Sequence, residues 1–146
     1  MIVFVMGASC AGKSTYIKEN YPDFYKVDLY DFQKRLGCSF EAIVESYEQC
    51  RLALIEAVKE HENVVMEHTL LRAIRRQPYI EAVREVTDSP IEIVSIFPSD
   101  EELLENAKKR KVKFFPGEFK SMREVYEIPT VEEGFLKVTI IDKNLY

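Results

Sequence analysis

Short apolar runs alternate with longer amphipathic stretches along most of the chain. The apolar runs predict five buried strands, near residues 2–6, 24–27, 63–66, 91–97 and 138–141. Apolar residues at helical spacing and capping signals predict helices between them, near residues 13–20, 30–36, 40–58, 72–86, 99–107 and 118–126. Because strands and helices alternate, we expect a mostly parallel five-stranded sheet with helices on both faces. The pattern therefore predicts an α/β fold with three layers.

The first predicted strand leads directly into a glycine-rich segment. Residues 7–15 match the phosphate-loop pattern G-x-x-x-x-G-K-[ST], and they lie between a strand and a helix as that loop requires. Glycine permits backbone angles at which successive N–H groups converge on phosphate oxygens. Lys13 would reach the β- and γ-phosphates, and the Ser14 hydroxyl would bind Mg²⁺. The sequence predicts that a nucleoside triphosphate is bound by the whole loop, Gly7, Ala8, Ser9, Cys10, Ala11, Gly12, Lys13, Ser14 and Thr15.

Length and composition limit the size and the setting of the protein. The chain has 146 residues, 47% of them hydrophobic, which is enough for one sizeable core, so we expect residues 1–146 to form a single domain. The first residues carry no charged leader, and no long apolar segment follows. Three cysteines at irregular spacing argue against a disulfide framework. We expect a cytoplasmic protein that does not enter a membrane, and the sequence leaves its oligomeric state open.

The distribution of charge bears on possible partners. The net charge is −5, which is unusual for a protein that coats duplex nucleic acid. Basic residues gather at Arg72, Arg75 and Arg76 and again between Lys108 and Lys113. This distribution suits the binding of a few phosphates in one place. The three arginines recur at helical spacing. They either bind the phosphates of a molecule that accepts a phosphoryl group, or they form an ordinary solvated face of the helix.

Carboxylates follow two of the predicted strands. Asp28 and Asp31 come just after the second strand, where a carboxylate could accept the proton of an acceptor hydroxyl or could cap the next helix. Glu67 follows the third strand, where it could hold a metal-bound water or orient Ser14. His68 is more easily read as a hydrogen-bonding neighbour, since the chain has only two histidines and no metal-binding set.

Arg110 lies in the basic run after the helix that Ser99 caps. Kinases need positive charge on the transferring phosphoryl group, and a mobile basic segment can supply it by closing over the triphosphate. A solvated surface is the alternative interpretation of such a run.

Several segments together resemble the small P-loop kinases of the polynucleotide 5′-hydroxyl kinase group. Residues 7–15 fit the phosphate loop of the group, and the resemblance extends over nearly the whole chain. Residues 64–69 resemble the third strand of the group, which ends in acid-x-Thr, and the paired arginines that follow are at 75–76. Residues 106–116 resemble its basic lid. Residues 126–135 resemble its aromatic-Glu-x-Pro-x-x-x-Glu-Gly-Phe ending.

The resemblance implies a P-loop NTPase fold with a helical lid near residues 108–120. It also implies transfer of the γ-phosphate of ATP, with Mg²⁺, to the 5′-hydroxyl of a DNA or RNA end. Asp31 would match the aspartate that activates the hydroxyl, and Arg110 the lid arginine. Lys13 and Ser14 would keep their usual roles. From its position after the third strand, we expect Glu67 to lie at the metal together with Ser14.

Two departures from the group affect the acceptor side. The group has an aspartate followed three residues later by an arginine. In this chain the corresponding pair is Asp31 and Lys34, and its place after the second strand is offset by one residue. Lysine cannot bind a phosphate through two parallel hydrogen bonds as arginine does. Leu70 replaces an asparagine. The predicted acceptor-binding residues are therefore Lys34, Arg72, Arg75 and Arg76. The acceptor is either a nucleic-acid end or a small alcohol such as a metabolite or nucleoside, and a nucleotide-binding module without transfer activity is the remaining alternative.

Overall fold

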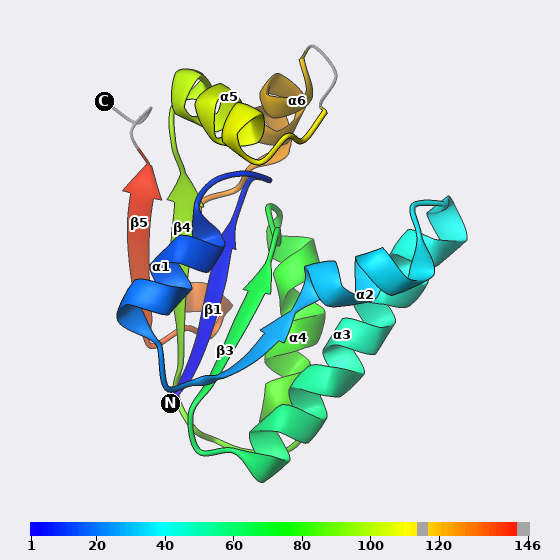
Figure 1. Cartoon of the computed structure of the whole chain (residues 1–146). Coiled ribbons are helices and arrows are strands. Elements are labelled where there is room, and N and C mark those ends of the chain that lie inside the picture. The colour runs from blue at the N-terminus through cyan, green and yellow to red at the C-terminus, as the bar shows by residue number, and fades with distance from the viewer. Residues whose placement is uncertain (114–116, 143–146) are drawn as a thin grey trace.

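The computed structural model describes residues 1–113 and 117–142. Its centre is a five-stranded sheet in the order β2-β3-β1-β4-β5 (Figure 1). Every neighbouring pair of strands is parallel. The strands are β1 (Ile2–Gly7), β2 (Tyr25–Asp28), β3 (Val64–His68), β4 (Ile91–Phe97) and β5 (Lys137–Asp142).

Helices connect the strands, and serine caps set the start of two of them. The Ser39 hydroxyl accepts a hydrogen bond from the backbone N–H of Ala42, and the Ser99 hydroxyl accepts one from Glu102. A 3₁₀ turn, η1, spans Val131–Glu133. The helices are α1 (Lys13–Asn20), α2 (Leu29–Leu36), α3 (Phe40–Glu60), α4 (Ala73–Arg84), α5 (Asp100–Lys109) and α6 (Glu118–Val125).

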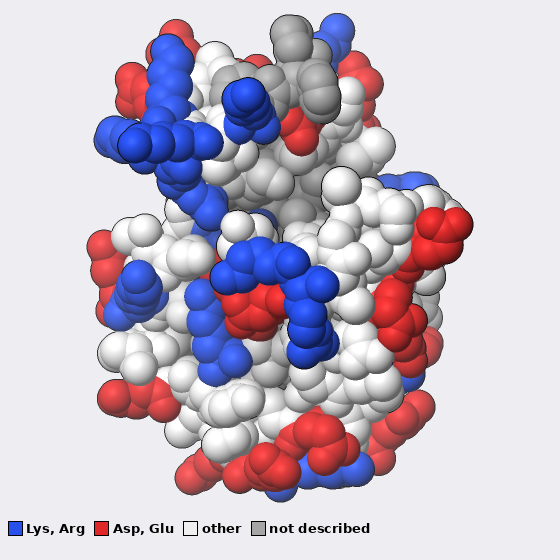
Figure 2. Space-filling view, turned by 45° about the vertical axis from the view of Figure 1, so that its right-hand side comes forward, with Lys and Arg blue, Asp and Glu red and all other residues white. Residues whose placement is uncertain are grey.

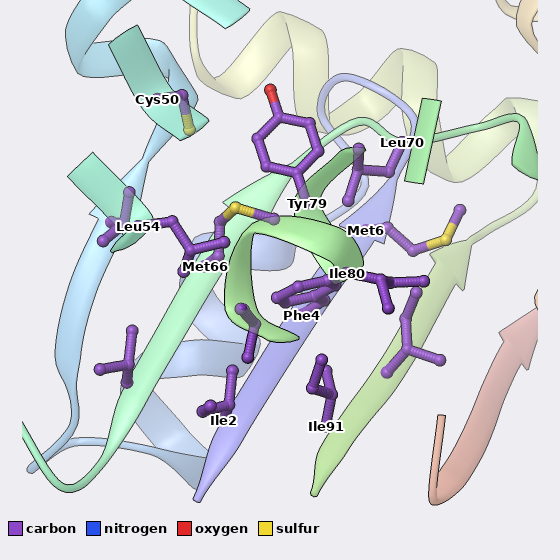
Figure 3. Packing of buried hydrophobic residues seen from close by; sticks show 14 of the residues in the cluster. Ile2, Phe4, Met6, Cys50, Leu54, Met66, Leu70, Tyr79, Ile80 and Ile91 are labelled. Atoms are coloured by element: carbon purple, nitrogen blue, oxygen red, sulfur yellow. The ribbon is translucent and has the colours of Figure 1, made fainter. Parts of the chain in front are cut away.

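Two sets of buried apolar side chains hold the layers together. On one face of the sheet Phe4 packs with Leu54 of α3 and Ile80 of α4 (Figure 3). On the other face Val5 belongs to a cluster that includes Leu103 of α5, together with residues of α1 and α6. Successive residues of β1 therefore face opposite layers, as the alternation of a strand requires. The predicted three-layer α/β fold is confirmed.

The strand register fixes where the site lies. Met6 is level with His68 on β3, and Asp28 of β2 is level with Glu67. The carboxyl ends of these three strands therefore meet at one edge of the sheet, where ligands bind in open parallel sheets. The predicted strands are confirmed with ends shifted by one or two residues. The strand order could not be read from the sequence.

The segment predicted to form the lid, residues 108–120, joins the end of α5 to the start of α6. Residues 114–116 of it lie outside the described residues. Over the part of the chain that the structure covers, no helix has both the length and the apolar character needed to cross a bilayer.

Candidate active site

The predicted phosphate loop connects β1 to α1. Gly7 has a φ of 153°, and a Cβ at this position would collide with the backbone carbonyl of Ile96 on β4. Gly12 has a φ of 95° and directly precedes α1. Cys10, between them, adopts a left-handed φ of 65°. The loop thus has the glycine-dependent backbone that the sequence pattern predicts, and it ends at the start of a helix, where anions bind favourably.

Lys13 lies buried at the start of α1. Its Nζ donates a hydrogen bond to the carbonyl oxygen of Gly7, at 2.9 Å. Burial lowers the pKa of this ammonium to about 8, although the nearby carboxylates of Glu67 and Asp28 favour the charged form. Most molecules therefore carry the positive charge at pH 7. A nucleotide phosphate could accept the hydrogen bonds of Lys13 that the loop carbonyl accepts here.

Ser14 and Glu67 meet as the sequence predicts. The Ser14 hydroxyl donates a hydrogen bond of 2.8 Å to Glu67 Oε1. Lys26 of β2 also reaches this group, with its Nζ 3.0 Å from Glu67 and 3.5 Å from Asp28. Sequence reasoning missed Lys26. The signal was present in its position two residues before Asp28, which places both side chains on one side of the strand.

The hydroxyl and carboxylate oxygens of Ser14 and Glu67 are the hard ligands that Mg²⁺ prefers. Within residues 1–113 and 117–142, no group of three or more His, Cys, Asp or Glu side chains could hold a metal ion. Two protein ligands nevertheless fit Mg²⁺, which commonly keeps several waters and binds substrate phosphates as well. We therefore expect Mg²⁺ to bind here together with a nucleotide.

A cavity of about 270 Å³ lies over the loop. It is lined by residues 10–15 and Glu67 and, from the end of α5, by Asn106, Lys109 and Arg110. Asn106 donates a hydrogen bond to the carbonyl oxygen of Cys10, which ties α5 to the loop. Figure 2 shows lysine and arginine side chains gathered at one side of a hollow below α5 and α6. Arg110 thus lies where a positive charge could reach a bound triphosphate.

The two candidate bases have different surroundings. Asp28 accepts a hydrogen bond from the backbone N–H of Tyr30 and so caps α2, which was one of the two interpretations of this residue. Burial, helped by nearby Glu67, raises the pKa of Asp28. Asp31 lies exposed in the first turn of α2. Within the described ranges, Asp31 has neither a hydrogen-bond nor an ion-pair partner.

Arg76 does not fit the prediction that it binds the acceptor. Its side chain is fully buried, and its guanidinium donates to both carboxylate oxygens of Glu133, at 2.7 and 3.1 Å. It also donates to the backbone carbonyls of Leu70 and Glu127. These four acceptors all belong to the protein itself, so they occupy the guanidinium that the prediction assigns to the acceptor. Arg76 therefore ties the segment after α6 to α4 and to the end of β3.

The other predicted acceptor-binding residues lie on the surface. Arg72 Nε is 3.4 Å from Glu127, whereas Arg75 has no ion-pair partner among the residues described. Lys34 is on α2, with its Nζ 5.0 Å from the centre of the Tyr30 ring. Leu70, which replaces the asparagine of the resembling group, has a left-handed φ of 44°, a conformation that asparagine tolerates better.

A second, larger cavity of about 540 Å³ lies beside β3, between α3 and α4. Sequence reasoning missed it because the apolar spacing on α3 predicts a helix but does not show which of its apolar side chains stay uncovered. The cavity is lined by Phe40, Ile43, Val44 and Tyr47 of α3, and by His68, Thr69, Arg72, Ile74, Arg75, Pro78 and others. Both Arg72 and Arg75 therefore lie at this cavity, whereas Arg76 does not.

His68 is buried beside this cavity in a hydrogen-bonded chain. The Tyr79 hydroxyl donates to the backbone carbonyl of Tyr47, so its oxygen accepts the Nε2 proton of His68, at 2.8 Å. Burial lowers the pKa of His68 to about 3, and the positive charge of Lys13 contributes. His68 is therefore neutral at pH 7, and its role as a hydrogen-bonding neighbour is supported by the geometry.

The buried His68 predicts acid sensitivity of the fold. The unfolded chain binds a proton at a pKa near 6.5 and the folded one only near 3, so stability is lost as the pH falls through this range. Between pH 7 and pH 5 we expect His68 to cost about 2 kcal/mol of unfolding free energy. Denaturant titrations at both pH values should show that His68→Gln removes this loss. His61→Gln, at an exposed position, should keep it, and an unchanged loss in His68→Gln would contradict the prediction.

The fold and the loop together define a P-loop protein with a kinase-like α/β architecture. The family model AAA_33, described as an AAA domain, matches residues 2–129, and the chain belongs to this family. A comparison with curated proteins finds no significant match.

Solved structures share the fold. A proposed kinase from Chloroflexus aurantiacus J-10-fl superposes with a TM-score of 0.73 at 14% identity, over 97% of this chain and 86% of that chain. A gluconokinase from Sinorhizobium meliloti 1021 superposes with a TM-score of 0.61 at 20% identity, over 97% of this chain and 82% of that chain. A chain of the Pnkp1/Rnl/Hen1 RNA repair complex superposes with a TM-score of 0.68 at 21% identity, over 85% of this chain and 42% of that chain. These identities establish the likeness of the fold alone.

Proposed function

We propose that this chain is a kinase that uses ATP and Mg²⁺ to phosphorylate a hydroxyl group. The arrangement at the end of β3 carries the proposal. Glu67 contacts Ser14 of the phosphate loop, and the next residue, His68, lines the larger cavity. The backbone N–H of Gly7 in the phosphate loop also donates a hydrogen bond to the carbonyl oxygen of Thr69, which lines the larger cavity, so this cavity reaches the loop at the end of β3. A protein that only binds a nucleotide has no need of a second cavity there.

The proposed reaction forms one bond and breaks one. The acceptor oxygen bonds to the γ-phosphorus, the bond from that phosphorus to the β–γ bridging oxygen breaks, and ADP leaves. We assign the proton of the hydroxyl to Asp31, since both oxygens of Asp28 already face partners, Tyr30 and Lys26. Asp31 lies on α2 outside the residues that line the two cavities, so the bound acceptor has to reach toward α2. Lys13 and Arg110 neutralise the transferring group. When bound at Ser14 and Glu67, Mg²⁺ would neutralise charge on the β- and γ-phosphate oxygens.

A small alcohol is the acceptor that the site favours. Of the three arginines predicted to bind acceptor phosphates, Arg76 is buried and Arg72 faces Glu127. Of these three arginines, only Arg75 has no carboxylate partner within the part of the chain that is described. One cation is few for a nucleic-acid strand, whose binding depends on contacts to several phosphates. The net charge of −5 points in the same direction.

The 5′-hydroxyl of a DNA or RNA end is the second candidate acceptor. The sequence resemblance supports it, and so does the likeness to a chain of an RNA repair complex. The basic residues of the lid also suit a nucleic-acid end, because Lys109 and Arg110 lie beside the nucleotide cavity.

Transfer of labelled γ-phosphate from ATP, with Mg²⁺, tests the proposal. The acceptors to compare are small alcohols, nucleosides and a 5′-hydroxyl oligonucleotide. Labelling of a small alcohol at a rate that added salt changes much less than the rate for the oligonucleotide would support the first candidate. Labelling of the oligonucleotide end that falls steeply with salt would support the second. Tight ATP binding without transfer to any alcohol would instead indicate a nucleotide-binding module.

Asp31→Asn should depress turnover by roughly 10²- to 10⁴-fold, because the amide cannot accept the acceptor proton. ATP affinity should change little, since Asp31 acts on the acceptor. Steady-state kinetics and a separate ATP-binding titration measure the two effects. Asp28→Asn is the matched control, because asparagine also caps helices. If Asp28→Asn lost turnover and Asp31→Asn did not, Asp28 would be the base.

A further inference from the structure

We infer that the larger cavity binds an acceptor with a flat apolar body and one anionic group, held with its hydroxyl toward β3 and its anion at Arg75. The inference rests on the proposed function, since it names the class of acceptor. It excludes highly polar sugar acids, which lack the apolar body, and long nucleic-acid strands, which carry many anions.

Large apolar side chains are left in water around this cavity. Phe40 is 78% exposed, Ile74 64% and Val44 52%, and all three line it. Phe40 and Val44 lie on the first turns of α3, and Ile74 lies on the first turn of α4. Exposed apolar groups concentrated in one hollow are typical of binding sites. An apolar ring inserted between α3 and α4 would cover these side chains.

The charges at the cavity select an anion. Arg51 is already held by both carboxylate oxygens of Glu48, at 3.0 and 2.7 Å. Arg72 faces Glu127 at 3.4 Å. Arg75 lines the same cavity and is exposed, and the described residues provide no carboxylate partner for it. A phosphate or carboxylate on the ligand would supply that partner through charge-assisted hydrogen bonds.

Polar groups at the strand end set the direction of the ligand. His68 and Thr69, the two residues after Glu67, are the polar residues that the end of β3 contributes to the cavity. The buried His68 ring is already hydrogen-bonded to Tyr79, so the Thr69 hydroxyl is the nearer partner for a ligand. Arg75 is on α4, beyond the loop that follows β3. A ligand with its hydroxyl at β3 and its anion at Arg75 would therefore present the hydroxyl to the phosphate loop. A volume of about 540 Å³ fits a small organic molecule.

Two fluorescent probes of the same shape test this assignment. 8-Anilinonaphthalene-1-sulfonate has an aromatic body and one anion, and N-phenyl-1-naphthylamine has the same body without the anion. Arg75→Gln should weaken binding of the sulfonate roughly tenfold and leave binding of the neutral probe nearly unchanged. Arg35→Gln, on α2 outside the cavity, is the matched control. Equal effects of Arg75→Gln on both probes, or none on the sulfonate, would overturn the assignment.

The apolar part has its own pair of variants. Phe40→Ser should weaken binding of both probes severalfold. Leu136→Ser changes an apolar residue that is 68% exposed and lies outside the cavity, and it should weaken neither. Thermal unfolding checks that each variant is folded. Equal effects of the two serine variants would overturn the inference. Probe binding that is lost as the protein self-associates at high concentration would also overturn it, because a second copy of the chain would then cover these apolar side chains.

Displacement of the sulfonate probe identifies the acceptor class. 4-(Hydroxymethyl)phenyl phosphate and 4-(hydroxymethyl)benzoate each carry an apolar ring, a hydroxyl and an anionic group, with a phosphate in one and a carboxylate in the other. We expect either or both to displace the probe, and gluconate not to. Displacement by gluconate alone would overturn the inference. All titrations are repeated in Lys13→Ala without ATP, so that a failure of phosphoryl transfer is distinguished from a failure of this site.

Discussion

Replacing Lys13 with alanine should reduce phosphoryl transfer by roughly a thousandfold or more. Its ammonium is the positive charge nearest the phosphates in a P-loop, and removing a group that neutralises a transferring phosphoryl group costs about 10³- to 10⁵-fold. In the structure the Lys13 Nζ is held by the loop carbonyl of Gly7 and lies in the electrostatic field of Glu67 and Asp28. The charge is thus positioned before any nucleotide binds. Single-turnover transfer of labelled phosphate measures the loss.

Lys18→Ala is the matched control, because Lys18 lies exposed in the last turn of the same helix, α1. It should keep full activity, and both variants should remain folded. Thermal unfolding of both variants separates a loss of stability from a loss of transfer. Full activity of Lys13→Ala would contradict the whole assignment as a kinase. Lost transfer with unchanged binding of the acceptor probes would leave the cavity assignment intact.

The parts of the site that follow local rules could be predicted from the sequence. The loop from Gly7 to Thr15 is a continuous segment whose backbone depends on its own glycines. Glu67 could be placed near Ser14 because both follow parallel strands, whose carboxyl ends meet at one edge. Its contact of 2.8 Å with the Ser14 hydroxyl agrees with that reasoning.

Features that depend on distant partners could not be predicted in this way. Strand order is set by pairing between segments far apart in the chain, and the apolar pattern of a strand does not name its neighbour. The apolar positions of α3 predict a buried face, but the pattern cannot tell that Phe40 and Val44 remain uncovered. The larger cavity is the consequence. Lys26 is a different case, because its position two residues before Asp28 is a local signal that the sequence reasoning overlooked.

The sequence contains a signal that Arg76 is buried, but the two neighbouring arginines made an exposed position the more obvious interpretation. Tyr79, Ile80 and Val83 follow Arg76 at the third, fourth and seventh positions, which places it on the buried face of α4. A cluster of three arginines nevertheless suggests a solvated or phosphate-binding face. Its carboxylate partner, Glu133, is 57 residues away in the sequence. Only the fold brings the two together.

Arg76→Met should lower the unfolding free energy by about 3–5 kcal/mol, the cost of breaking a buried ion pair by removing one partner. The side chain of Arg76 is 0% exposed and that of Glu133 is 18% exposed. The variant would leave the Glu133 carboxylate without its cation and the carbonyls of Leu70 and Glu127 without a donor. Denaturant titration at pH 7 measures the change.

Arg72→Met provides the comparison, because Arg72 faces the same segment at Glu127 with both side chains about half exposed. Such an exposed pair contributes at most about 1 kcal/mol. The double variant Arg76→Met/Glu133→Leu should lose less than the sum of its single variants, since no unpaired charge remains buried. If Arg76→Met kept full stability but lost acceptor binding, the sequence-based prediction would be right and the structural role wrong. The stability of Arg76→Met therefore decides between the two roles of one arginine.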